Sequence, residues 1–213
     1  MPPGDTHDAT SIRDLRPPSS VVVIGAGTGG PQALMEILPR FLPAYAGTVI
    51  VLQQMRAGFT RVLSGHLNEV CRLRVHEPID GQELRAAEVL MVPGGSRITI
   101  DKSNPGMIRV EDVQDDPEAL HSRIDATMAS IAAAFGRDSV GVLLTGMGDD
   151  GRDGMRSISD SGGTTIAQDE ESSIVYDLPS SAIDAGAVHH VLPLWNIADQ
   201  IISLAEETHA NAA

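Results

Sequence analysis

The sequence predicts an α/β fold, namely a doubly wound, mainly parallel seven-stranded sheet with helices on both faces and an inserted antiparallel hairpin. Two observations support this prediction. Short runs of apolar, β-branched residues, such as residues 21–24, contain no polar residue, which is typical of strands buried on both faces of a sheet. These runs alternate with segments of helical periodicity, and such strand–helix units pack as right-handed crossovers on one parallel sheet.

The first expected strand is Val-Val-Val-Ile at residues 21–24, and it ends at Gly25. Six further segments have the length and the apolar content of buried strands. The seven expected strands span residues 21–24, 48–53, 72–76, 88–92, 139–145, 164–168 and 187–192.

Helices are expected between these strands. Pro31 occupies a favoured first helical position, and Pro39 is expected to end the helix that Pro31 opens. Apolar residues recur at helical spacing over residues 120–135, which indicates one amphipathic helix there. The expected helices span residues 32–38, 58–70, 117–135, 151–160 and 194–205.

An antiparallel hairpin is expected to interrupt the parallel pattern. Residues 97–101 and 107–111 alternate in polarity around a turn segment that contains Asn104, Pro105 and Gly106. This arrangement predicts two paired strands inserted at one edge of the sheet.

The chain of 213 residues is expected to hold one domain. Residues 1–20 are rich in proline and polar residues without an apolar period, so a flexible leader is expected there. The domain is expected over residues 21–206, and residues 207–213 are expected to form a tail.

Composition and charge exclude several classes of function. The chain has 15 basic and 29 acidic side chains, a formal net charge of −14, and only 3% aromatic residues. A phosphate backbone would be repelled, so no nucleic acid partner is expected. No apolar run is long enough to cross a bilayer, so no membrane insertion is expected. The single Cys71 excludes an internal disulfide, and no signal-peptide pattern is present, so a cytoplasmic location is expected.

Two glycine-rich segments follow expected strands at the sheet edge where open α/β proteins bind ligands. They read GAGTGGP at residues 25–31 and TGMGDDG at residues 145–151. Each leads into a helix, whose free amides and dipole favour an anion or a developing oxyanion.

Five motifs resemble the methylesterase domain of the chemotaxis CheB family, response-regulator enzymes that hydrolyse glutamyl methyl esters on chemoreceptors. They keep the family's order over about residues 21–203. The motifs are VVIGAGTGGP (22–31), QQM (53–55) with GFT (58–60), VPGG (92–95), LLTGMGDDG (143–151), and AQDE (167–170) with VYDLP (175–179). The resemblance implies the same fold and a function related to chemotaxis signalling.

The resemblance also implies which positions carry the chemistry. The family has a nucleophilic serine in Gly-Ala-Ser-Thr-Gly-Gly, a histidine base in Gln-His-Met and an orienting aspartate in Gly-Met-Gly-x-Asp-Gly. Gly27 stands at the serine position and Gln54 at the histidine position, while Asp150 keeps the aspartate. Glycine has no side chain to attack an ester, and a glutamine amide is not a base at neutral pH. We therefore predict a catalytically silent domain in which Asp150 has no base left to orient.

Thr28 and Met147 complete the expected cleft. Thr28 follows Gly27 and is the alternative nucleophile, but Gln54 leaves it without a base, so a structural role at the helix start is expected. Met147 is expected to offer its backbone amide to the oxyanion position.

The substrate groove is expected to have diverged as well. Arg56 replaces the proline of the family's Gln-His-Met-Pro, and the family's His-Arg-Pro-Ser-x-Asp corresponds to LHSRID at residues 120–125. The family's receiver domain does not fit into the about twenty residues before Val21, so regulation by phosphorylation is expected to need another chain. The resemblance implies a protein partner, either a chemoreceptor or a separate receiver domain.

Two other functions stay open. One is an active protein-glutamate methylesterase or deamidase that uses groups not identified in the sequence. The other is dinucleotide binding, because Gly25-x-Gly27-x-x-Gly30 after a buried strand satisfies that fingerprint. The second expected strand, however, ends without the acidic residue that would hold the ribose.

No metal and no cofactor are expected. The carboxylates of Asp149, Asp150 and Asp153 are close in sequence, but their spacing matches no calcium loop. His189 and His190 are adjacent on an expected strand, so their side chains point to opposite faces and cannot share one ion.

Overall fold

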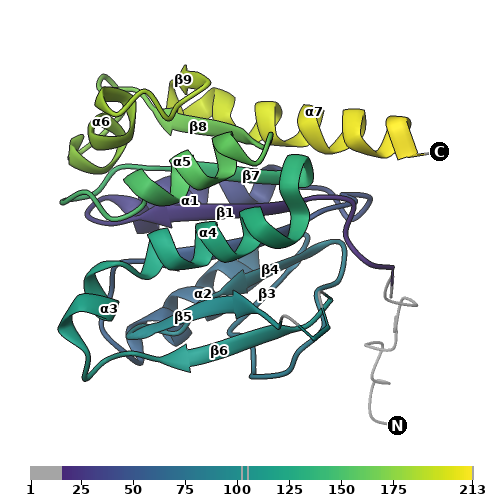
Figure 1. Ribbon diagram of the computed structural model, residues 1–213, viewed down its shortest axis with the longest axis horizontal. Helices are drawn as coiled ribbons and strands as arrows, with labels where there is room; N and C mark the ends of the chain where they lie inside the picture. Colours follow the sequence, from purple (N-terminus) through teal and green to yellow (C-terminus); the bar gives the residue numbers. More distant parts are fainter. Residues whose placement is uncertain (1–15, 102, 105, 213) are drawn as a thin grey trace, which may run out of the picture.

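The computed structural model describes residues 16–101, 103–104 and 106–212, so residues 1–15 of the expected leader lie outside the described residues. Its main sheet has seven strands, all parallel, in the order β3-β4-β2-β1-β7-β8-β9 (Figure 1). The strands are β1 (Val21–Ala26), β2 (Thr48–Gln53), β3 (Arg74–His76), β4 (Glu88–Met91), β7 (Ser139–Leu143), β8 (Thr164–Gln168) and β9 (His190–Leu192). The predicted seven-stranded parallel sheet is confirmed.

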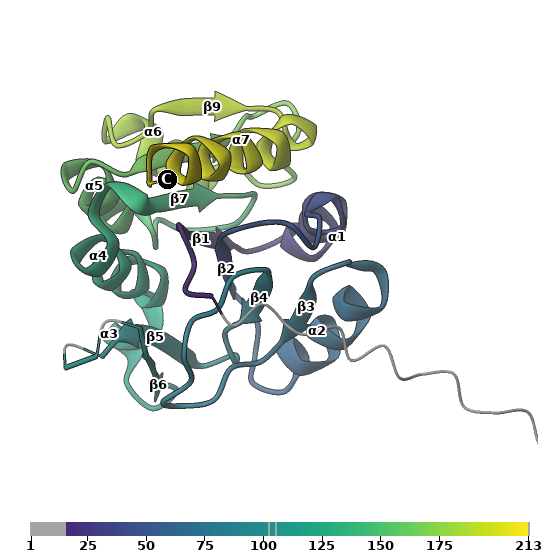
Figure 2. The ribbon, with the colours of Figure 1, turned by 90° about the vertical axis from the view of Figure 1, so that its right-hand side faces the viewer.

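Helices cover both faces of the sheet, as predicted (Figure 2). Helices α1, α2 and α7 pack on one face, and α4, α5 and α6 pack on the other face. The helices are α1 (Gly30–Ile37), α2 (Phe59–Val70), α3 (Pro117–His121), α4 (Arg123–Phe135), α5 (Arg152–Asp160), α6 (Asp177–Asp184) and α7 (Leu194–Ala212).

The central strand β1 contributes side chains to both apolar layers. Val22 and Ile24 belong to the layer beneath α1 and α7, whereas Val21 and Val23 belong to the layer beneath α4 and α5. All six residues of β1 are buried. The alternation follows from the two-residue period of a strand, and it explains why an uninterrupted apolar run suits this position.

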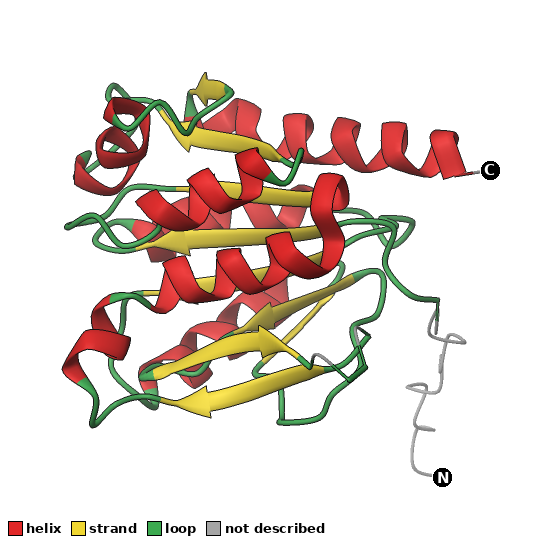
Figure 3. Cartoon of the chain, in the orientation of Figure 1, coloured by secondary structure: helices red, strands yellow, loops and turns green. Residues whose placement is uncertain are grey.

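The predicted antiparallel hairpin is confirmed as β5 (Ser96–Ile100) and β6 (Ile108–Asp112), although it forms a separate two-stranded sheet and does not pair with an edge strand of the main sheet (Figure 3). Strand β5 lies against α4 instead. The backbone N–H of Ile98 donates to Thr127 Oγ1 at 3.2 Å, and that of Ile100 donates to Ser130 Oγ at 2.8 Å. The hydroxyl oxygens of α4 therefore accept the hydrogen bonds of these two β5 amides. In a larger sheet, the carbonyls of a neighbouring strand would accept them.

Three helical segments differ from the prediction. The helix expected over residues 117–135 is divided into α3 and α4 at Ser122. Helix α6 was not predicted. Helix α7 continues to Ala212, through most of the expected tail at residues 207–213, and it projects beyond the sheet (Figure 1). Among the described residues, no helix combines the length and the apolar character required to cross a bilayer.

Candidate functional site

The strand order reverses direction at β1, whose neighbours are β2 on one side and β7 on the other. Such a switch point opens a crevice at the carboxyl ends of the strands. The loops that follow β1 and β7 meet there, because the N–H of Gly27 donates to the carbonyl of Thr145 at 2.9 Å. A Cβ atom added at Gly146 would lie 2.7 Å from the nitrogen of Gly27, so this approach of two backbones requires glycine.

Gln54 fills the space beside Gly27. A Cβ atom added at Gly27 would lie 2.5 Å from the Oε1 atom of Gln54 and 3.2 Å from the nitrogen of Met147. The Gln54 backbone is fixed by its N–H, which donates to the carbonyl of Ala26 at 2.7 Å. The structure thus brings together three positions that the sequence singled out, namely Gly27, Gln54 and Met147.

The side chain of Gln53 holds the same loop through a hydrogen bond to its backbone. Its Nε2 atom donates to the carbonyl of Gly27 at 2.7 Å, and its Oε1 atom occupies the space over Gly30 that a Cβ atom would need. A Cβ atom at Gly25 would lie 2.8 Å from the Ile124 side chain and 2.9 Å from that of Leu143. Close packing therefore accounts for the glycines of the Gly25-x-Gly27-x-x-Gly30 pattern.

Thr145 joins the two glycine-rich loops to β8 and to residues 174–175. Its Oγ1 atom lies within hydrogen-bond distance of the Thr28 carbonyl, at 2.9 Å, and accepts from the amides of Ile174 and Val175. Its own N–H donates to Gln168 Oε1 at 2.8 Å. Thr28 itself is exposed, and no side chain caps α1, whose N-cap is Gly29. The structural role of Thr28 is therefore carried by its carbonyl and not by a capping hydroxyl.

Asp150, which was expected to have no base left to orient, caps a helix in the structure. Its two carboxylate oxygens accept the N–H groups of Ile124 and Asp125 at 3.1 and 3.0 Å, so they cap the first turn of α4. The side chain is only 7% exposed. Burial raises the pKa of Asp150 to about 6, although the two amides and the charge of Arg123 favour the ionised form.

Asp125, in α4, caps the helix that follows Asp150. Its Oδ1 atom accepts the N–H groups of Gly151 and Gly154 at 2.9 and 2.7 Å, so it caps the first turn of α5. Burial also raises the pKa of Asp125. Sequence reasoning missed this role, although Ser122-x-x-Asp125 is a pattern typical of a helix start.

Arg123 was also missed. It is only 5% exposed, and its Nε and Nη1 atoms donate to the carbonyls of Leu120 and Ser96 at 3.3 and 3.2 Å. Burial lowers the pKa of Arg123, and the charge of Asp150 opposes that shift. A guanidinium nevertheless keeps its charge at neutral pH.

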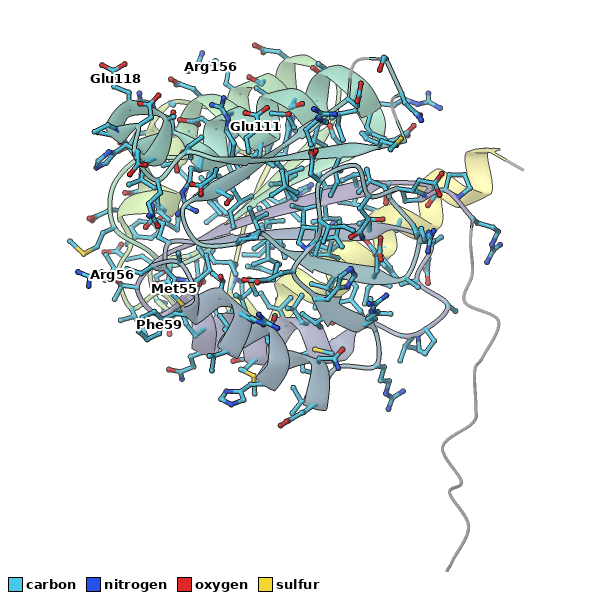
Figure 4. The ribbon with its side chains drawn as sticks, turned by 90° about the horizontal axis from the view of Figure 1, so that it is seen from below. Met55, Arg56, Phe59, Glu111, Glu118 and Arg156 are labelled. Carbon is cyan, nitrogen blue, oxygen red and sulfur yellow. The ribbon has the colours of Figure 1, made fainter. Side chains whose placement is uncertain are left out.

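Gln54, Arg123 and Asp150 line a cleft of about 940 Å³, whereas Gly27 and Thr28 are not among its lining residues. Figure 4 shows Met55, Arg56 and Phe59 close together where the chain enters α2, and the first two line the cleft. Met147 is 60% exposed at its rim. The other lining residues include Gln54, Gln114, His121, Arg123, Asp149 and Asp150.

The acidic side chains near the cleft diverge from one another. Asp149 and Asp153 both pair with Arg152 at 3.2 Å, whereas Asp150 faces the start of α4. His189 accepts from the Thr165 amide through its Nδ1 atom at 3.1 Å. Within the described part of the chain, no three His, Cys, Asp or Glu side chains are placed to hold a metal ion.

Comparisons with known proteins agree with this architecture. The profile of the CheB methylesterase family matches residues 22–201. The crystal structure of the CheB methylesterase catalytic domain from Thermotoga maritima superposes with a TM-score of 0.81 at 33% identity, over 87% of this chain and 98% of that one.

Curated relatives carry the name protein-glutamate methylesterase/protein-glutamine glutaminase 1. The protein from Carboxydothermus hydrogenoformans is 42% identical over 183 residues, which cover 85% of this chain and 54% of the relative. The protein from Chromobacterium violaceum is 38% identical over 197 residues, which cover 92% of this chain and 54% of the relative. The chain thus spans about half the length of these relatives. With the matched profile, the shared sheet and the superposed catalytic domain in agreement, the chain belongs to the CheB methylesterase family.

Proposed function

We propose that this chain is a methylesterase-like domain that has lost esterase and deamidase chemistry and binds a protein partner in its cleft, in chemotaxis-related signalling. The contact between Gly27 and Gln54 carries the proposal. Gln54 Oε1 lies 2.5 Å from the point where a side chain at position 27 would begin. In this arrangement the Gln54 amide occupies the space in which a side chain at position 27 would begin.

The remaining groups of the cleft do not restore the chemistry. The Gln54 amide cannot accept the proton of a hydroxyl, and Thr28 has no hydrogen bond to a base among the described residues. In a serine protease, loss of the triad nucleophile costs on the order of 10⁶ in turnover. The backbone amide of Met147 remains beside Gly27, but an oxyanion donor without a nucleophile forms no acyl-enzyme.

The partner is proposed to be a chemoreceptor or a separate receiver domain, in the cytoplasm. The relatives are named for hydrolysis of protein glutamate methyl esters and of protein glutamine. Both reactions act on one side chain of another protein, and both yield a glutamate side chain. The cleft of this chain, with Met147 exposed at its rim, is large enough for such a side chain and its neighbours.

Methanol release from a methylated chemoreceptor fragment tests the proposal. The unmodified chain is expected to release no more methanol than buffer does, and the double variant Gly27→Ser/Gln54→His is expected to gain turnover. The matched control Gly27→Ala/Gln54→His adds a Cβ atom and the base without a nucleophile, and it is expected to stay silent. Turnover by the unmodified chain would show that a substitute nucleophile exists.

The dinucleotide alternative is disfavoured by the side chains above the first loop. Gln53 occupies the space over Gly30 and Gln54 the space over Gly27, where a pyrophosphate would approach the backbone. Titration with NAD(H) and NADP(H) is expected to show no saturable binding. A micromolar affinity would contradict this assignment.

A further inference from the structure

Among the described residues, Arg123 is a buried cation without an ion pair. No carboxylate in this part of the chain lies within 4.0 Å of its guanidinium, which bonds only to the carbonyls of Leu120 and Ser96. The Nη2 amino group makes no hydrogen bond to the described residues, and it is not one of their fully buried polar atoms that lack a partner, so it keeps contact with solvent. Charged donors of a guanidinium bind carboxylates readily, so an amino group that has no ion pair and reaches solvent is available to an anion.

The acidic and histidine side chains that line the cleft with Arg123 have partners other than its guanidinium. The charge of Asp150 acts on Arg123, but both Asp150 oxygens accept amides of α4. Asp149 pairs with Arg152 at 3.2 Å. His121 is held by its Nδ1 atom, which donates to the carbonyl of Pro117 at 2.5 Å. Arg123 is one of the residues that line the cleft.

We propose that the guanidinium of Arg123 binds the γ-carboxylate of a glutamate side chain in the cleft, so that the domain recognises the free acid in preference to the ester or the amide. This inference rests on the proposed function, because only a domain that does not turn over its ligand can act as a reader of the glutamate state. A guanidinium prefers a carboxylate to a neutral ester or amide because the hydrogen bonds are then charge-assisted.

The test compares three labelled alanine-rich peptides that differ only at one central residue, which is Glu, Gln or the γ-methyl ester of Glu. Fluorescence anisotropy of the unmodified chain is expected to show about tenfold tighter binding of the Glu peptide than of the other two. The variant Arg123→Gln is expected to bind all three with equal affinity, and Arg123→Lys is expected to retain part of the preference. Arg137→Gln removes the same charge from an exposed position outside the cleft, so the preference should persist there.

The side-chain Nε–H resonance of Arg123 gives a readout that does not depend on the stability of the variants. It is expected to shift with the Glu peptide and to stay unchanged with the Gln peptide. Equal affinities for the three peptides, or a preference that survives Arg123→Gln, would overturn the inference. Methanol is measured in the same samples. Its release from the ester peptide contradicts the proposed function, whereas equal affinities without release contradict only the carboxylate site.

Discussion

Asp125 and Asp150 cap the first turns of each other's helices. Asp150 precedes α5 and accepts two amides of α4, while Asp125 lies in the first turn of α4 and accepts two amides at the start of α5. The N-cap residues themselves, Ser122 of α4 and Gly151 of α5, provide no side-chain cap. Asp150 caps α4 in place of Ser122, and Asp125 caps α5 in place of Gly151. The exchange joins two helices that stand beside the cleft.

Removal of the Asp125 carboxylate is expected to destabilise the fold. Asp125→Ala leaves the buried amides of Gly151 and Gly154 without their acceptor, so the free energy of unfolding should fall by about 1–2 kcal/mol. Asp116→Ala is the matched control, because Asp116 caps α3 through two amides in an exposed position. It should cost less in urea unfolding. An equal loss in the two variants would contradict the importance of the exchanged caps.

The stability of the protein should depend on the protonation of Asp150. Its pKa in the folded state is about 6, above the ordinary value of 3.8, so between these values the folded chain holds a proton that the unfolded chain has lost. The contribution of Asp150 to stability is therefore complete below pH 3.8 and is lost as the pH rises through 6. The loss is on the order of 3 kcal/mol.

Asp150→Asn tests this dependence because its side chain does not ionise. Relative to the unmodified chain, the variant should gain free energy of unfolding as the pH rises from about 4 to about 7. Asp149→Asn removes a carboxylate from the exposed neighbouring position and is the matched control. Parallel pH profiles of the unmodified chain and Asp150→Asn would refute the assignment.

Gly27 and Gln54 should be coupled in a double-mutant cycle. Gly27→Ser places a Cβ atom 2.5 Å from Gln54 Oε1 and 2.8 Å from Gly146 Cα, so it should cost about 1–3 kcal/mol of stability. In a Gln54→Ala background the first clash is removed, and the cost of Gly27→Ser should shrink by at least about 0.5 kcal/mol. Additive effects in thermal unfolding would show that Gln54 does not fill the space beside Gly27.

Thr145→Val tests the junction between the two loops and β8. Valine keeps the shape of threonine but leaves the amides of Ile174 and Val175 without the Oγ1 acceptor. The expected cost is about 1–3 kcal/mol, and hydrogen exchange should increase at these two amides first. Thr99→Val, which removes a hydroxyl that bonds the partly exposed Glu111, is the matched control and should have a smaller effect. Unchanged exchange at residues 174–175 would show that the hydroxyl does not hold this segment.

Most of the sheet could be predicted because its strands carry their own signal. Residues 164–168 are assigned identically by the sequence and the structure, and β1 and β2 each contain an apolar run of four residues, VVVI at 21–24 and VIVL at 49–52. Helix α6 was missed because Pro179 and two serines weaken its helical signal, and its formation depends on the burial of Leu178 and Ala182. The break at Ser122 was missed because the carboxylate that caps α4 comes from Asp150, far along the chain.

The sequence could predict the positions of the candidate site that belong to short motifs, but not the contacts between them. The substitutions at positions 27 and 54 could be recognised from short motifs, but their contact arises only when β1 and β2 lie side by side. The roles of Asp125 and Arg123 depend on partners in other loops, namely Gly151, Gly154 and Ser96. Periodicity and motif spacing contain no information about such partners, because they describe neighbours along the chain only.

The central position of β1 also governs how the polypeptide can acquire its structure. During synthesis β1 can pair with β2 early, since Val21 aligns with Thr48, but its other edge must wait for β7, where Val21 aligns with Ser139. Until the ribosome has delivered that strand, the most apolar segment of the chain has an unpaired edge. Such non-local parallel pairing slows folding and leaves the nascent chain open to association with other unfinished chains. The emergence of β7 is therefore the step that we expect to close the central sheet.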